Sequence, residues 1–97
     1  MRRAAKTDAN HSSVVEDFRK RGFSVLDVSQ LKKCCDIFVS KRNQTIAIEI
    51  KDGEKVPSKR KLTEGEQNFK DMWKGRYEIV EFPADVARVA FSVSHST

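Results

Sequence analysis

The sequence lacks long apolar runs and has few of the residues that build disulfide or metal frameworks. No stretch approaches the roughly 20 apolar residues that span a bilayer, and the polar start MRRAAKTDANHSS has no signal-peptide core. The only two cysteines, Cys34 and Cys35, are adjacent, and the two histidines, His11 and His95, lie near opposite ends. This spacing suits neither a disulfide framework nor a paired CxxC zinc site, and indicates buried or half-buried thiols. We therefore expect a soluble cytoplasmic protein that does not associate with membranes.

Charge, by contrast, is plentiful and mostly positive. Charged residues make up 34% of the 97 residues, and 19 Lys and Arg against 14 Asp and Glu give a formal net charge of +5. This excess favours a polyanionic partner. The length suits one compact domain over residues 1–97, in which we expect the polar residues 1–10 to be flexible.

Capping residues and an apolar stripe predict a first helix from about 12 to 21. Ser13 followed by Glu16 fits the S-x-x-E capping box, and Gly22 suits the end of the helix. The apolar stripe consists of Val14, Val15 and Phe18. This helix would pack one face against the rest of the domain.

Two further helices are predicted in the second half of the chain. Thr63 and Glu66 form another capping box, at the start of a helix that ends at Gly75. One face of this helix would carry the apolar residues Phe69, Met72 and Trp73. The spacing of valines over 84–93 predicts a short last helix.

Four segments have the alternation and the β-branched content of strands. They cover residues 23–28, 36–40, 45–51 and 77–82. The second and third are separated only by KRNQ, where Asn43 tolerates the left-handed backbone of a tight turn, so we expect them to pair antiparallel. The element order is α-β-β-β-α-β-α, which indicates an α/β fold.

The run IAIEIKDG has one core face and one face that carries charge. Its isoleucines Ile46, Ile48 and Ile50 share the core face. Ala47, Glu49 and Lys51 lie on the other face, where the small alanine leaves room for another group to approach. A turn centred on residues 42–43 pairs residues whose numbers add up to 85, so Asp36 would lie directly opposite Glu49.

Two opposed carboxylates repel each other unless a cation compensates, and Mg²⁺ commonly binds one or two carboxylates together with waters and phosphate oxygens. Lys51, two residues beyond Glu49, would hold or polarise the water that attacks phosphorus. An alternative is that Glu49 and Lys51 form a solvated pair on the open face of an edge strand, while Asp36 caps its own strand. Spacing alone leaves both interpretations open.

Several motifs, in order along most of the chain, resemble the PD-(D/E)xK nuclease superfamily. They are AKTDAN, RKRG, CDIFV, IAIEIKDG, SKRKLTEGEQ and YEIVEF. Within the superfamily they are most similar to the minimal VRR-NUC or Holliday-junction-resolvase-like nucleases of phages and bacteria. The resemblance implies a restriction-endonuclease-like core, with a central mixed sheet flanked by helices. It also implies hydrolysis of branched or structured DNA with Mg²⁺ or Mn²⁺, by a homodimer in the cytoplasm of a bacterial or phage-infected cell.

The resemblance also implies roles for individual residues. The catalytic residues would be Asp36, Glu49, Lys51 and Gln67. The metal would be bound by Asp36, Glu49 and the main-chain carbonyl of Ile50. Contacts to the DNA backbone would come from Lys55, Ser58, Lys59, Arg60 and Lys61, in a basic loop too broken for regular structure. The alternatives are that Gln67 is a surface residue and that the loop is merely solvated.

Two positions depart from the pattern of the superfamily. Cys35 replaces the usual proline before the aspartate, which removes no catalytic atom. Ser13 stands nine residues before Gly22, at the position where relatives often place a glutamate. Glu16 could replace that glutamate at the site only if its side chain does not act in the capping box. These departures motivate a second hypothesis, a weak or inactive DNA-binding module on the same fold. A third is a basic interaction domain without a role on nucleic acid.

Overall fold

The computed structural model describes residues 10–31 and 33–94, which form three α-helices and one short 3-10 helix around a four-stranded sheet. The strands lie in the order β1 (Ser24–Asp27), β2 (Ile37–Lys41), β3 (Gln44–Ile50) and β4 (Arg76–Val80). The helices are α1 (His11–Lys20), α2 (Glu64–Met72) and α3 (Pro83–Ser94). β1, β2 and β3 pair antiparallel, whereas β3 and β4 pair parallel, so the sheet is mixed. The predicted order α-β-β-β-α-β-α and the α/β class are confirmed.

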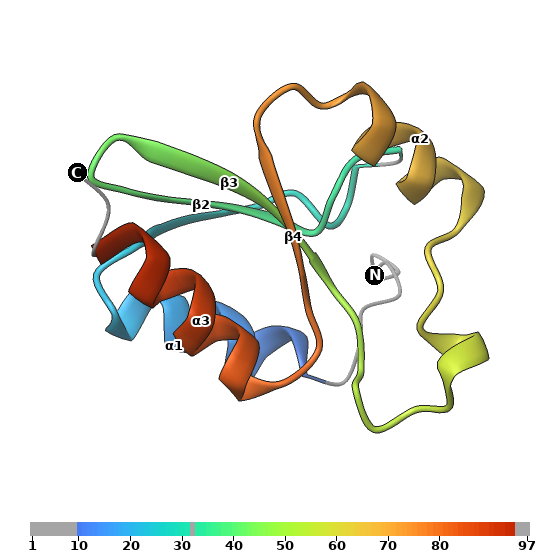
Figure 1. Ribbon diagram of the computed structural model, residues 1–97, viewed down its shortest axis with the longest axis horizontal. Coiled ribbons are helices and arrows are strands. Elements are labelled where there is room, and N and C mark those ends of the chain that lie inside the picture. Colours follow the sequence, from blue (N-terminus) through green and yellow to red (C-terminus); the bar gives the residue numbers. More distant parts are fainter. Residues whose placement is uncertain (1–9, 32, 95–97) are drawn as a thin grey trace, which may run out of the picture.

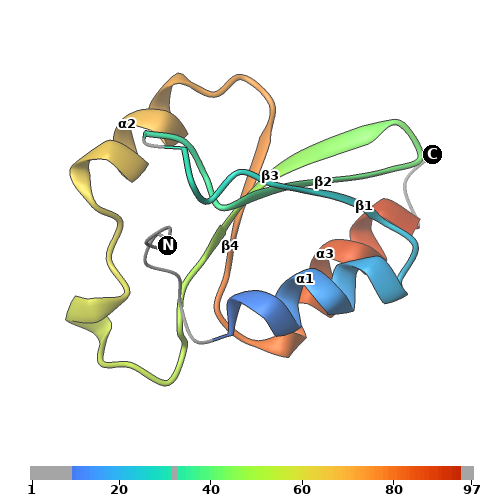
Figure 2. The same ribbon diagram turned by 180° about the vertical axis from the view of Figure 1, so that it is seen from behind.

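The two faces of the sheet are covered by different helices. Figure 1 shows α1 and α3 together on one face and α2 on the other, and Figure 2 shows the same layers from behind. The isoleucines of β3 belong to the large core under α1 and α3, as predicted. On the opposite face, Ala47 is fully buried in a smaller cluster with Cys35 and Phe69 of α2. Helix α2 therefore covers the face of β3 on which Ala47 lies.

The hairpin between β2 and β3 has the predicted register. Arg42 and Asn43 both have positive φ, +55° and +65°, as a type I′ turn requires. The pairs run from Lys41 opposite Gln44 to Ile37 opposite Ile48, so their residue numbers add up to 85. Beyond this pair the ladder changes, because the N–H of Asp36 also donates to the carbonyl of Ile48, at 3.1 Å, and Asp36 is not paired with Glu49 in the sheet.

The first helix begins one turn before the predicted capping box, which is not formed. Its N-cap is Asn10, and the hydroxyl of Ser13 donates to the Asn10 carbonyl at 2.9 Å. The side-chain amide of Asn10 donates to the main-chain carbonyls that follow β3 and β4, at 3.1 and 3.3 Å. These distant partners hold the start of the helix, and Glu16 is left exposed on its surface. The predicted end is confirmed, since Gly22 follows the C-cap with φ +90°.

The capping box of the second predicted helix is formed. The Thr63 hydroxyl accepts from the Glu66 N–H at 3.2 Å, and the Glu66 carboxylate accepts from the Thr63 N–H at 2.8 Å. Phe69 and Trp73 face the small cluster as predicted, but Met72 is 60% exposed and was wrongly placed on that face. The helix ends at Met72, three residues before Gly75.

The sequence also predicted a flexible N-terminal segment and no membrane-spanning helix. Residues 1–10 were expected to be flexible; residues 1–9 lie outside the described residues, whereas the Asn10 side chain donates two hydrogen bonds to distant carbonyls. In the part of the chain that is described, none of the helices has the length and apolar character needed to cross a bilayer.

Candidate functional site

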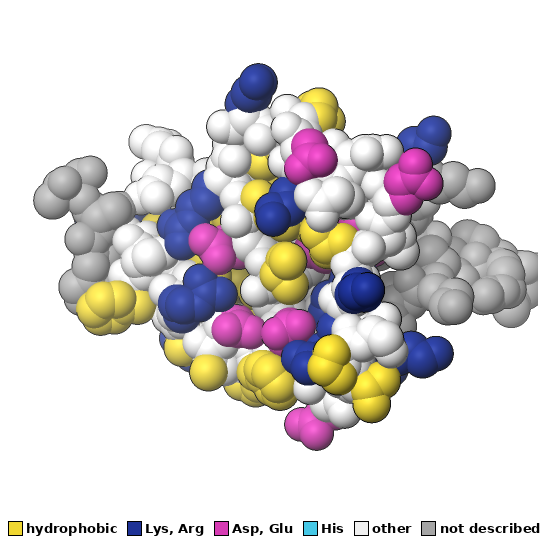
Figure 3. Space-filling view, turned by 45° about the vertical axis from the view of Figure 1, so that its right-hand side comes forward, with side chains coloured by type: hydrophobic (Ala, Val, Ile, Leu, Met, Phe, Trp, Pro, Cys, Tyr) yellow, Lys and Arg dark blue, Asp and Glu magenta, His cyan; other side chains and the backbone are white. Residues whose placement is uncertain are grey.

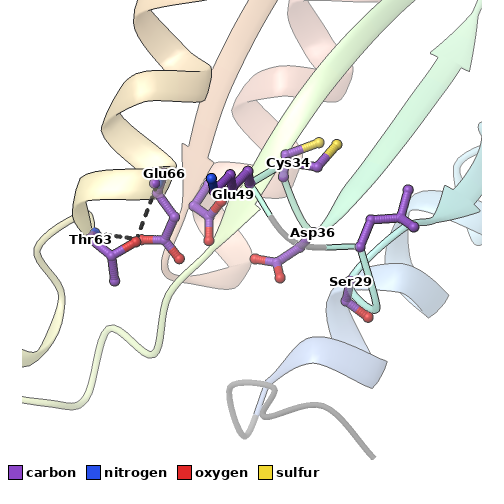
Figure 4. Close-up of a pocket in the computed structure, with 10 residues that line it drawn as sticks. Ser29, Cys34, Asp36, Glu49, Thr63 and Glu66 are labelled. Atoms are coloured by element: carbon purple, nitrogen blue, oxygen red, sulfur yellow. Dashed lines mark hydrogen bonds between the residues drawn. The ribbon is translucent and has the colours of Figure 1, made fainter.

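A pocket of about 250 Å³ lies between the ends of the central strands and α2 (Figure 4). Asp36 precedes β2 and Glu49 lies near the end of β3, and both line this pocket. The opposite wall is the first turn of α2, with Thr63, Gly65 and Glu66. The segment between β1 and β2 forms the remaining side. The pocket therefore holds the two carboxylates that the hairpin register predicted to be opposed.

Asp36 and Glu49 interact electrostatically in the pocket. One carboxylate oxygen of Asp36 accepts the N–H of Ile50 at 2.8 Å, which fixes Asp36 against β3. Glu49 is only 3% exposed, and burial together with the Asp36 and Glu66 carboxylates raises its pKa to about 10. Glu49 therefore carries a proton at neutral pH when no cation is present. Such crowding of carboxylates is what a bound cation relieves.

Lys51 is buried beside these carboxylates. Its side chain is 10% exposed, with Nζ 2.8 Å from Glu66 Oε1 and 4.0 Å from Glu49 Oε2. β3 lies between β2 and β4, so it is a central strand. The alternative of a solvated Glu49 and Lys51 pair on an open edge strand is therefore wrong.

Glu66 lines the pocket, although its sequence pattern predicted only a role in the capping box. Its Oε1 accepts two hydrogen bonds at 2.8 Å, one from Lys51 and one from the Thr63 N–H. Burial acts to raise the pKa of Glu66, but the hydrogen bonds from Lys51 and Thr63 outweigh it, so the pKa is lowered and Glu66 is ionised. The capping box already indicated that this carboxylate turns back toward the start of α2. Only the placement of α2 shows that Lys51 lies there.

We expect Thr63→Ala to lower the free energy of unfolding by about 1 kcal/mol, because it removes the side-chain half of the capping box. Urea denaturation monitored by circular dichroism would measure this change. Thr63→Ser keeps the hydroxyl and should unfold within about 0.5 kcal/mol of the wild-type value. Equal losses in both variants would contradict a capping role.

The structure does not bring Gln67 into the pocket. Gln67 is exposed on α2, and its side-chain amide donates to Asp71 at 2.9 Å. Ile50 contributes its side chain to the large core and its N–H to Asp36. The catalytic role of Gln67 and the metal-binding role of the Ile50 carbonyl remain predictions.

The two departures from the superfamily pattern lie in different places. Ser13 lines a separate hollow between α1 and α3, and neither it nor Glu16 lines the pocket. The third carboxylate of the site thus comes from Glu66 on α2. Cys35 is a buried thiol in the pocket wall, as predicted, and burial followed by the nearby Cys34 raises its pKa to about 12. It is therefore a neutral side chain at physiological pH.

The basic loop after β3 is exposed but contains a short 3-10 helix at Pro57–Lys59, so the prediction that it lacks regular structure was wrong. Arg60 is partly buried and pairs with Glu81 at 3.3 Å. The other predicted DNA contacts, Lys55, Ser58, Lys59 and Lys61, are exposed. In Figure 3, lysine and arginine side chains are interspersed with acidic and hydrophobic ones on the face shown. The loop thus exposes the cations Lys55, Lys59 and Lys61 to a ligand.

No family model, curated protein or solved structure matches this chain. The functional interpretation therefore depends on the motif residues and on the geometry of the pocket.

The donor set of the pocket is compatible with one hard cation. Among the residues described, no three or more His, Cys, Asp or Glu side chains form a group able to hold a metal ion. Asp36 and Glu49 nevertheless supply two adjacent carboxylates, whereas Glu66 is engaged by Lys51. Two carboxylates completed by waters and a phosphate oxygen are typical ligands of Mg²⁺. The residues present thus fit Mg²⁺ or Mn²⁺ better than a softer metal.

Proposed function

We propose that this protein is a metal-dependent endonuclease that hydrolyses phosphodiester bonds in structured or branched DNA. The observation that carries the proposal is the group formed by the partly buried Asp36 and the buried Glu49 and Lys51 near the end of β3. Burial of a carboxyl group and a lysine costs stability in a small domain, so we attribute the group to function. The same three residues are those that resemble the nuclease motif.

Each residue has a role that its surroundings support. Asp36 and Glu49 would hold Mg²⁺ or Mn²⁺, which when bound supplies positive charge to the scissile phosphate and lowers the pKa of a water. Glu66 holds the Lys51 ammonium in place at 2.8 Å. From there Lys51 orients the attacking water and stabilises the negative charge that develops on the phosphate oxygens. The burial of Lys51 and Glu49 keeps these interactions strong, because little bulk water screens them.

The exposed lysines of the basic loop would hold the DNA backbone. Lys55, Lys59 and Lys61 are free to approach phosphates, whereas the contact of Arg60 with Glu81 orders the loop instead. Such contacts recognise shape and charge more than sequence, which agrees with branched DNA as substrate. Two copies of the protein would present two sites to two strands. Phe91, 63% exposed on α3, is a candidate contact of that homodimer.

A panel of substrates tests the proposal. Wild-type protein is incubated with a four-way junction, a flap, a nicked duplex and a plain duplex, each with Mg²⁺, Mn²⁺, Ca²⁺ or a chelator. We expect cleavage with Mg²⁺ or Mn²⁺ and none with the chelator, and Glu49→Gln is the matched control that should bind DNA without cutting it. Absence of cleavage on every substrate and with every metal would reject the endonuclease.

The second candidate function is a DNA-binding module that cuts weakly or not at all. It is favoured by Ser13, which leaves α1 without an acidic group at the pocket. In the same panel this function predicts binding that weakens steeply with salt, without turnover.

A further inference from the structure

An exposed lysine outside the E-x-K motif, Lys33, lines the pocket. Lys33 belongs to the segment between β1 and β2, and among the residues described it is the one basic side chain that lines the pocket. The pocket walls otherwise contribute the carboxylates of Asp36, Glu49 and Glu66 and uncharged groups. The positive charge of Lys51 is already directed at Glu66. Among the residues described, Lys33 is thus the cation of the pocket lining that can meet an anionic group.

Hydrogen bonds hold both ends of the segment between β1 and β2 that carries Lys33. At its start, the Asp27 carboxylate accepts from the N–H and the hydroxyl of Ser29 at 3.0 and 2.7 Å, and contacts His11 Nε2 at 3.0 Å. At its end, the Val28 N–H donates to the carbonyl of Asp36 at 2.9 Å. The hydrogen bond brings the two ends of the segment together, and Figure 4 shows Ser29 and Cys34 from this segment beside the pocket.

The Lys33 side chain approaches α2 at Gly65. A Cβ added to Gly65 would lie 3.9 Å from Lys33 Cγ, so the stem of the lysine approaches the first turn of α2. Lys33 is exposed and forms no ion pair with another described residue. Its ammonium group is therefore available to a ligand. The aliphatic part of the side chain packs near Gly65.

We propose that Lys33 binds a backbone phosphate of the DNA next to the scissile one, and so positions the substrate over Asp36 and Glu49. This inference rests on the proposed function, since it needs a polyanionic substrate in the pocket. A single ammonium group and a phosphate form a charge-assisted hydrogen bond that is independent of base sequence. Lys33 thus acts on substrate binding, whereas Lys51 acts on the chemical step.

Lys33→Gln tests this role, with Lys33→Arg as the conservative variant. Lys20→Gln is the matched control, because Lys20 is also exposed but lies on α1 outside the pocket. For Lys33→Gln we expect KM for the preferred DNA to rise about 5- to 20-fold while kcat stays within about 3-fold, as loss of a phosphate contact predicts. The slope of log affinity against log salt should fall by about 1, measured with Ca²⁺ and a labelled junction. Lys33→Arg should restore KM, and Lys20→Gln should not change it.

The outcomes separate this inference from the proposed function. If wild-type protein cuts DNA and Lys33→Gln has the wild-type KM and salt slope, the role of Lys33 is refuted and the nuclease stands. If the wild type binds DNA without cutting it, the salt slope alone decides the role of Lys33. Failure of the wild type to bind any DNA rejects both. A lower melting temperature for Lys33→Gln, with an equal loss of kcat, would indicate a structural role and overturn the inference.

Discussion

Lys51→Met is expected to lower the rate of DNA cleavage by about 10² to 10³, while DNA affinity stays within about 3-fold of the wild-type value. Methionine keeps the length and apolar stem of lysine in this buried position, so the pocket retains its shape. What is lost is the ammonium group that lies 2.8 Å from Glu66 and 4.0 Å from Glu49. Single-turnover assays with saturating protein would measure the chemical step, and filter binding with Ca²⁺ would measure affinity.

Glu66→Gln tests how much the rate depends on the ion pair that positions Lys51, while leaving the Lys51 ammonium group in place. Glutamine also fits the third position of a capping box, so α2 should keep its start. The charge that holds Lys51 is removed, and we expect the rate to fall about 10-fold, less than in Lys51→Met. Wild-type rates in both variants would show that this buried ion pair has no part in cleavage.

Glu49→Gln is expected to stabilise the metal-free protein, increasingly so as the pH rises. The pKa of Glu49 is about 10 in the folded chain, against an unperturbed value of 4.5, so the folded state binds a proton that the unfolded state has lost. The stability of wild-type protein is therefore undiminished below about pH 4.5 and falls as the pH rises toward 10. Glutamine resembles the protonated carboxyl group and does not titrate.

Thermal denaturation at pH 5, 7 and 9 in a chelating buffer measures this effect. The melting temperature of Glu49→Gln should exceed that of wild type by a margin that grows with pH, at about 4–8 °C per kcal/mol for a domain of this size. Glu54→Gln, at an exposed glutamate after β3, is the control and should show no such trend. Mg²⁺ should narrow the gap by stabilising only the wild type. A margin that stays constant with pH would contradict the buried, proton-binding state of Glu49.

Local chemistry made the hairpin and the start of α2 predictable. Two adjacent residues in the left-handed region determine the type I′ turn, and the turn sets the register of β2 against β3. Strand alternation then places Glu49 and Lys51 on one face, and Asp36, just before β2, brings its carboxylate close to Glu49. The capping box at Thr63 involves residues three apart, so it too was visible in the sequence. These features depend on neighbours in the chain or on a single tight turn.

Contacts between distant residues decided the rest. The box at Ser13 failed because Asn10 bonds to main-chain carbonyls 41 and 71 residues away, which moves the start of α1. Glu66 meets Lys51 across 15 residues, and Lys33 reaches the pocket only because α2 packs over Ala47. The sequence by itself determined that Glu49 and Lys51 share the face of β3 opposite the isoleucines. The packing of α2 on that face decided that both side chains are buried and that Lys51 is held by Glu66. No local pattern in the sequence shows which face of a sheet a later helix will cover.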